Sequence, residues 1–159
     1  MPAKKKATRR KKAAKESRGL TAQELVGEAP AAGIQKLAHA IVEDGGVIVG
    51  TYREPLGGNW QILAGLPLSK VEPTPYQRDL SPTHVARLAK AIDKLDRFLD
   101  PVIAVRTDDG GYWTPNGYHR LGALKQLGAK SILALVVPDE KGKAKGVIHL
   151  HDILKQGIV

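Results

Sequence analysis

The segment between Ser81 and Phe98 constrains the fold of this 159-residue chain more than any other. Its apolar residues recur three and four positions apart, which places them on one face of a helix. Ser81 is a favourable N-cap and Pro82 a favourable first helical residue, so we predict a helix that begins there and ends near Phe98. The residues of the predicted apolar face are Val85, Leu88, Ala89, Ile92 and Leu95.

Short strand-like runs lie on both sides of this helix. Before it, residues 47–52 and 60–63 predict a hairpin with a turn rich in Pro and Gly. After it, residues 102–105 and 112–114 predict a second hairpin around an Asp-Asp-Gly-Gly turn, and the apolar run 132–137 has the length of another strand. Strands that alternate with helices in this way predict a sheet with helices packed on it.

Further helices are predicted at three places. Thr21 and Glu24 have the spacing of a capping box and predict a short helix over residues 22–28. Residues 34–42 carry apolar side chains at helical spacing, and a third helix is predicted to begin near His119. Together the elements predict an α+β fold, a small mixed sheet with packed helices.

The charge of the chain is concentrated at its start. Residues 1–18 hold nine of the 25 Lys and Arg residues and one of the 16 Asp and Glu residues, whereas the rest holds 16 basic and 15 acidic residues. A segment with no apolar side chain larger than Ala between Pro2 and Leu20 cannot bury a face, so we predict disorder there. Such a cationic arm is typical of non-specific DNA binding. The predicted DNA-contacting residues are Lys4, Lys5, Lys6, Arg9, Arg10, Lys11, Lys12, Lys15 and Arg18.

Composition excludes several classes of protein. The chain has no cysteine, which excludes disulfide scaffolds, thiolate metal sites and cysteine catalysis. No apolar run is long enough to span a bilayer, and the basic start lacks the apolar stretch of a secretory signal. The histidines show no metal-ligand pattern, so we predict no metal site. The expected location is cytoplasmic, associated with the nucleoid.

The segment Thr114–Arg120 is the strongest candidate for a binding site. It joins the end of a predicted strand to the start of a predicted helix, where a Gly permits a sharp turn. The first N–H groups of a helix have no internal partner and, with the helix dipole, favour an anion. His119 and Arg120 lie in this first turn, where a cation is unfavourable for the helix unless it meets an anion. A turn with a solvated His-Arg pair is the alternative that spacing alone leaves open.

Three motifs in order resemble the ParB/sulfiredoxin superfamily, from about Leu66 to Val137. The first is the proline-rich extended segment 66–78, which ends in Gln77-Arg78. The second is the amphipathic helix followed by residues 100–105, and the third is residues 116–124 followed by a Leu-Gly pair and an apolar strand. The resemblance implies a nucleotide phosphate cradle formed by Asn116, Gly117, Tyr118, His119 and Arg120, with Gln77 and Arg78 as further nucleotide contacts.

The chain departs from each member of that superfamily at a catalytic position. Tyr118 stands where ParB proteins have an acidic residue and where sulfiredoxins have the reactive Cys, which excludes sulfinic acid reduction. Asn116 and Gln77 stand where the free serine kinases have an Asp and a Glu base. We therefore expect nucleotide binding with weak or no hydrolysis.

These inferences combine into one functional hypothesis. It is a ParB-like module, in the manner of chromosome partitioning proteins, that binds a nucleoside triphosphate, CTP or ATP, with Mg²⁺ as a candidate companion. DNA binds through the arm, a homodimer is a candidate assembly, and no membrane is involved. A phosphotransferase or nuclease on the same fold is the alternative, and a protein-interaction domain with a vestigial cradle is a third.

We divide the chain into a disordered tail (1–19), N-terminal helices with a β-hairpin (20–65), the ParB/sulfiredoxin-like nucleotide-binding domain (66–138) and a C-terminal extension (139–159). Within the extension, residues 147–154 fit a helix or a strand.

Overall fold

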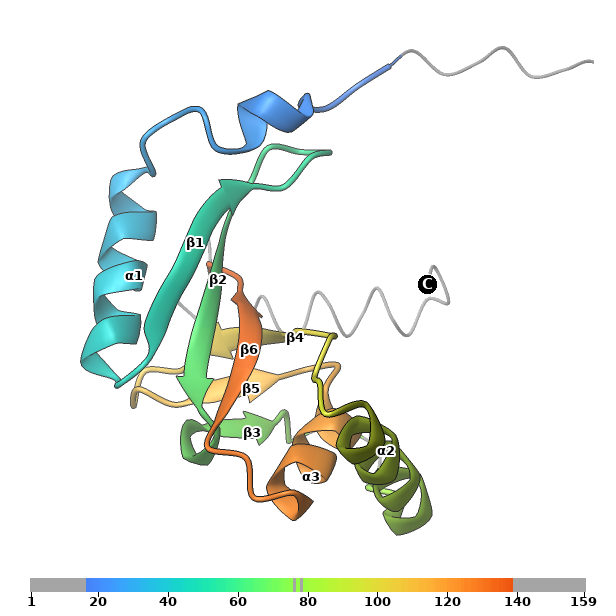
Figure 1. Cartoon of the computed structure of the whole chain (residues 1–159). Helices are drawn as coiled ribbons and strands as arrows, with labels where there is room; N and C mark the ends of the chain where they lie inside the picture. The colour runs from blue at the N-terminus through green and yellow to red at the C-terminus, as the bar shows by residue number, and fades with distance from the viewer. Residues whose placement is uncertain (1–16, 76, 78, 139–159) are drawn as a thin grey trace, which may run out of the picture.

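The computed structural model describes residues 17–75, 77 and 79–138, and its centre is a six-stranded mixed sheet (Figure 1). The order of strands across the sheet is β1-β2-β6-β4-β5-β3. Neighbours pair antiparallel except for β4 with β6 and β3 with β5, which are parallel. The strands are β1 (Val47–Arg53), β2 (Trp60–Pro67), β3 (Val71–Pro73), β4 (Val102–Arg106), β5 (Tyr112–Thr114) and β6 (Ser131–Val136). The predicted α+β class with a small mixed sheet is confirmed.

Among the described residues, three α-helices accompany the sheet: α1 (Ala32–Glu43), α2 (Pro82–Leu95) and α3 (Tyr118–Gln126). In Figure 1, α1 lies along β1 and β2, whereas α2 and α3 lie together at the other end of the sheet. Helix α1 contributes Ile34 and Ile41 to the main core, and α3 contributes Leu121 and Leu124. Both helices pack against the same side of the sheet, because their core residues share one cluster with alternate residues of the central strands.

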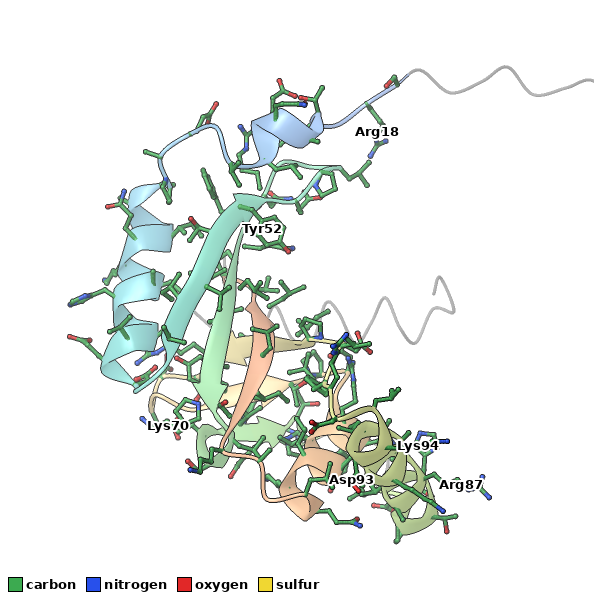
Figure 2. All side chains as sticks on the ribbon, in the orientation of Figure 1. Arg18, Tyr52, Lys70, Arg87, Asp93 and Lys94 are labelled. Atoms are coloured by element: carbon green, nitrogen blue, oxygen red, sulfur yellow. The ribbon has the colours of Figure 1, made fainter. Side chains whose placement is uncertain are left out.

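Helix α2 packs on α3 rather than directly on the sheet. Val85 and Ala89 form a second, small core with Ala123 of α3. The exposed side of α2 carries charged side chains, among them Arg87, Asp93 and Lys94, and Figure 2 shows Arg87 pointing away from the fold. The helix therefore has the one-sided character that its sequence predicts.

The end of α2 differs from the prediction. The helix ends at Leu95 instead of near Phe98, because Asp96 adopts a left-handed conformation with φ of 48°. Leu95 was predicted on the apolar face but is 65% exposed, since it lies in the last turn. Phe98, beyond the helix, packs against the main core.

The segment between β2 and α2 is more regular than its prolines predict. Strand β2 extends to Pro67, a 3-10 helix η2 spans Leu68–Lys70, and the short strand β3 follows it. The division predicted between residues 65 and 66 falls inside β2, which pairs with β6 from Ile62 to Pro67. At the N-terminal end, the predicted helix over 22–28 is a 3-10 helix η1 at Ala22–Leu25, and Glu24 accepts hydrogen bonds from Thr21.

A partly buried ion pair joins α1 to the β4–β5 hairpin. Asp44, just after α1, accepts two hydrogen bonds from Arg106, at 2.7 Å from Nε and 3.0 Å from Nη2. The hydroxyl of Tyr112 donates a third, at 2.6 Å. The guanidinium of Arg106 holds the pKa of Asp44 below its ordinary value, and burial raises the pKa of Tyr112. This cluster links residues more than 60 positions apart in the sequence.

Within the described residues, no helix is both long enough and apolar enough to cross a bilayer. Of the predicted DNA-contacting residues, Arg18 is described and exposed, whereas Lys4 to Lys15 lie outside the described residues.

Candidate functional site

The predicted cradle connects β5 to α3, as its sequence indicates. Helix α3 begins at Tyr118, with Gly117 as its N-cap, and no side chain caps its first turn. The backbone N–H groups at the start of α3 consequently have no partner within the helix. The helix dipole adds positive potential at this end. The local geometry is that of an anion-binding site.

The glycine in this loop is required by packing inside the chain. A Cβ atom added to Gly117 would lie 2.4 Å from Cγ1 of Val102 and 2.9 Å from Oγ1 of Thr114. The close approach at this position is therefore to β4 and β5. The Thr114 hydroxyl is fully buried and has no hydrogen-bond partner among the described residues.

Replacing Gly117 by Ala is expected to lower the free energy of unfolding by about 1–3 kcal/mol, because the added methyl group overpacks the contact with Val102. Chemical denaturation measures the change. Gly33→Ala is the matched control, since nothing lies within 4 Å of that position in α1, and it should be neutral or stabilising. Equal stability of Gly117→Ala and the wild type would show that the loop relaxes freely.

Arg120 fastens the cradle to the segment that precedes β4. Its Nη1 donates to the backbone carbonyls of Asp100 and Pro101, at 3.0 and 3.1 Å, and lies 2.7 Å from the Asp100 carboxylate. Its Nη2 donates to the carbonyl of Asn116, at 3.1 Å. The Arg120 side chain is only 18% exposed. The two Nη atoms therefore link the loop, at Asn116, to the segment that precedes β4.

His119 faces the start of α2. Its Nε2 accepts a hydrogen bond from the backbone N–H of Ser81, at 3.3 Å, which leaves Nδ1 as the donor of the neutral ring. The His84 ring lies edge-on to the His119 ring, with centroids 4.7 Å apart. The N-termini of α2 and α3 thus meet at a pair of histidines, and both helix dipoles direct positive potential toward it.

Two further residues that were predicted to contact the nucleotide, Gln77 after β3 and Asn116 in the loop, form hydrogen bonds within the chain. The Gln77 side chain donates to the carbonyl of Thr114, the residue at which the cradle begins. The Asn116 side chain accepts from the N–H of Ile103, at 3.1 Å. Arg78 was predicted beside Gln77 but lies outside the described residues.

The carboxylate of Asp100 lies beside the cradle. Asp100 pairs with Arg120, yet its side chain is 77% exposed, so the carboxylate is open to solvent. In the part of the chain that the structure describes, no group of three or more Asp, Glu or His residues is arranged to hold a metal ion.

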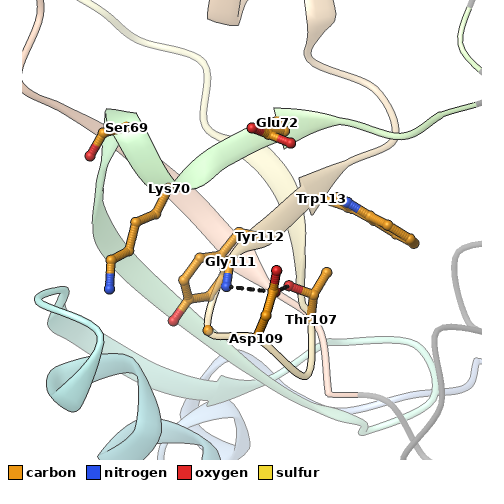
Figure 3. A pocket seen from close by; sticks show the side chains of 9 residues that line it. Ser69, Lys70, Glu72, Thr107, Asp109, Gly111, Tyr112 and Trp113 are labelled. Carbon is orange, nitrogen blue, oxygen red and sulfur yellow. Dashed lines mark hydrogen bonds between the residues drawn. The ribbon is translucent and has the colours of Figure 1, made fainter.

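A separate hollow of about 260 Å³ lies near the β4–β5 turn (Figure 3). Figure 3 shows Lys70 and Trp113 on opposite sides of it. Asp109 accepts hydrogen bonds from Thr107 and Gly111 inside the turn, and these hold its pKa below the ordinary value. None of the cradle residues lines this hollow, so it is a different feature of the surface.

The sequence profile of the ParB N-terminal domain matches residues 53–149, more than half of the chain. The chain belongs to the ParB N-terminal domain family. The match includes the cradle, α2 and every strand except most of β1. The resemblance predicted from three short motifs is therefore confirmed. No curated protein sequence gives a significant match.

Solved structures of three kinds resemble this ParB N-terminal domain at low identity. Sulfiredoxin from Arabidopsis thaliana is 23% identical, with a TM-score of 0.46, and the alignment covers 54% of this chain and 96% of that one. A free serine kinase in complex with AMP is 20% identical (TM-score 0.43), with 47% and 30% covered. The C-terminally truncated ParB from Caulobacter crescentus, complexed with CTP-γ-S, is 20% identical (TM-score 0.46), with 57% and 51% covered. This chain spans about a third of the kinase and about half of that ParB.

Sequence reasoning missed three neighbours of the cradle: Ser81, His84 and Asp100. Ser81 was recognised only as a helix cap, and no role in the site was predicted for His84. Both lie more than 30 positions from His119, and no spacing rule connects them. No role in the site was predicted for Asp100, whose pairing with Arg120 depends on how the chain enters β4.

Proposed function

We propose that this ParB N-terminal domain binds a nucleoside triphosphate, CTP or ATP, with its phosphates at the start of α3. The observation that carries the proposal is the meeting of two helix N-termini at His119, one of them without a side-chain cap. Phosphate oxygens would accept hydrogen bonds from the N–H groups at the start of α3 and from the His119 ring. The preference for CTP or ATP comes from the sequence resemblance.

Arg120 has two roles in this proposal. Its contacts with Asp100, Pro101 and Asn116 fix the loop in the absence of ligand. A triphosphate would compete with the Asp100 carboxylate for the same guanidinium, because both are anions that form charge-assisted hydrogen bonds. Binding would then release Asp100, which is exposed and could meet a Mg²⁺ ion that accompanies the phosphates.

Hydrolysis is expected to be weak or absent. Tyr118 supplies no acid, and the His119 nitrogen that could accept a proton already accepts the Ser81 N–H. The Asp100 carboxylate is paired with Arg120, so it is not free to accept a proton from water until that pair separates. These contacts support a binding module more than an enzyme.

Nucleotide titration by calorimetry tests the proposal. CTP, ATP and GTP are each added to wild type, Arg120→Ala and His119→Ala, with and without Mg²⁺. Arg120→Ala is expected to weaken binding about ten- to a hundred-fold and His119→Ala about ten-fold, since each removes hydrogen bonds to a charged ligand. His39→Ala, an exposed histidine on α1, is the control and should bind like wild type. Equal affinity of all four proteins for every nucleotide would refute the site.

A phosphotransferase or nuclease remains the second candidate, because Asp100 lies at the edge of the cradle. If the domain releases phosphate from a nucleotide, Asp100→Asn should abolish release, and Asp93→Asn, an exposed Asp on α2, should leave it unchanged. Phosphate release that persists in Asp100→Asn would eliminate this carboxylate as the base.

The DNA association belongs to the same proposal. The cationic arm 1–18 would hold the domain on DNA, as expected for a chromosome-partitioning role, while the cradle binds nucleotide. A homodimer is compatible with both activities.

A further inference from the structure

One side of the sheet has no described helix packed on it. Residues of β2, β6 and β4 alternate between two sides, and those facing α1 and α3 are fully buried. Most residues on the opposite side are apolar: Leu63, Leu133, Leu135 and Ile103 are only partly buried, and Val105 is 8% exposed. Leu63 pairs with Leu135, which pairs with Ile103, so three apolar side chains form a row across the three central strands. We call this side the open face, and its apolar residues are Leu63, Leu133, Leu135, Ile103 and Val105.

An apolar sheet face of this kind is normally covered, because a sheet buries both sides or leaves a polar side to water. Here the central strands have aliphatic residues on both sides. The described helices α1, α2 and α3 all lie on the other side, so none of them covers the open face.

The sequence after β6 supplies a matching segment. Val147, Leu150, Leu154 and Ile158 recur at helical spacing, and His149 and Gln156 would lie opposite them. The chain leaves the sheet at Val136, the end of a central strand. The ten residues 137–146 can extend to roughly 33 Å, which is ample to return across the sheet.

We propose that residues 147–158 form an amphipathic helix whose apolar side docks on the open face of the same chain. Leu150 and Leu154 would lie over the row formed by Leu63, Leu135 and Ile103. The proposal is independent of nucleotide binding, because the cradle lies at the end of β5 and at the start of α3.

Methyl NMR of the full chain with a nitroxide label tests this docking. The chain has no cysteine, so Gln156→Cys places one label on the polar side of the predicted helix. The methyl signals of Leu63, Leu135 and Ile103 should lose most of their intensity, whereas those of Val85 in the small α2–α3 core should change little. Equal broadening at both places, or none at the open face, would overturn the proposal.

Two substitutions and one mixed sample test whether the apolar stripe of the same chain covers the open face. Adding Leu150→Asp to the labelled chain should restore the open-face signals, whereas His149→Asp, an equal charge on the opposite side, should not. If both substitutions act alike, the apolar stripe is not the docking surface. In a mixture of isotope-labelled chains and nitroxide-bearing chains, the open-face signals should stay sharp. Broadening in this mixture would assign the face to a second copy of the chain and would also overturn the proposal.

Discussion

Asp44→Asn is expected to lower the free energy of unfolding by about 2–4 kcal/mol near pH 7, because it leaves the guanidinium of Arg106 without its charge partner. The Asp44 side chain is 10% exposed and that of Arg106 is 28% exposed, so water cannot fully replace the lost contact. The hydroxyl of Tyr112 loses an ionic acceptor as well. Urea denaturation of wild type and variant measures the difference.

The pH dependence of the free energy of unfolding shows whether the Asp44–Arg106 ion pair causes the loss of stability. The pKa of Asp44 is lower in the folded chain than in the unfolded chain, where it is about 3.9. Its ionised form therefore stabilises the fold above that value, and this contribution disappears as the pH falls through the folded pKa. The difference in free energy of unfolding between wild type and Asp44→Asn should stay constant from about pH 7 to 5 and decrease below about pH 4. Asp93→Asn, at an exposed position, should change stability by less than about 0.5 kcal/mol. An Asp44→Asn variant as stable as wild type would mean that the ion pair contributes nothing to the fold.

Replacing the Lys and Arg residues between Lys4 and Lys15 by Gln is expected to abolish most of the affinity for duplex DNA. The remainder of the chain is nearly neutral, so it exerts little long-range attraction on phosphates. If about five cations of the arm contact DNA, log K should fall against log salt with a slope near −4.5. Raising the salt from about 50 to 200 mM would then weaken wild-type binding several-hundred-fold. Fluorescence anisotropy at several salt concentrations measures both quantities.

The control removes cations from the folded part. Replacing Lys36, Lys90, Lys94 and Lys125, all exposed, by Gln should leave DNA affinity within a few-fold of wild type. The arm has no aromatic side chain and no predicted fixed geometry, so binding should be indifferent to DNA sequence. Tight or sequence-selective binding by the arm variant would place a DNA-binding surface on the folded domain.

The sequence predicts the elements better than it predicts their extent. Helix α2 follows from its apolar spacing and from Ser81-Pro82, because these signals are local. Its end at Leu95 depends on the left-handed backbone of Asp96, which no periodicity indicates. Strand β3 is only three residues long, and its pairing with β5 stabilises it. The prolines of this segment predicted an extended connection instead of a strand. Such long-range pairing is not visible in one segment read alone.

The candidate site shows the same limit. The loop 114–120 is recognisable because a strand, a glycine and a helix follow one another in the sequence. The packing of Gly117 could not be predicted from this pattern, because its close neighbours, Val102 and Thr114, come from β4 and β5. The contacts of His119 with Ser81 and of Arg120 with Asp100 join separate segments, and only the folded chain brings them together.

Amide NMR of the full chain during titration with CTP and with ATP tests the nucleotide cradle most directly. The account predicts that the amide signals of Tyr118, His119 and Arg120 shift most, that the amide of Thr83 at the start of α2 shifts with them, and that those of α1 stay in place. Saturable shifts that centre on the hollow near Trp113, or no shift with either nucleotide, would contradict it.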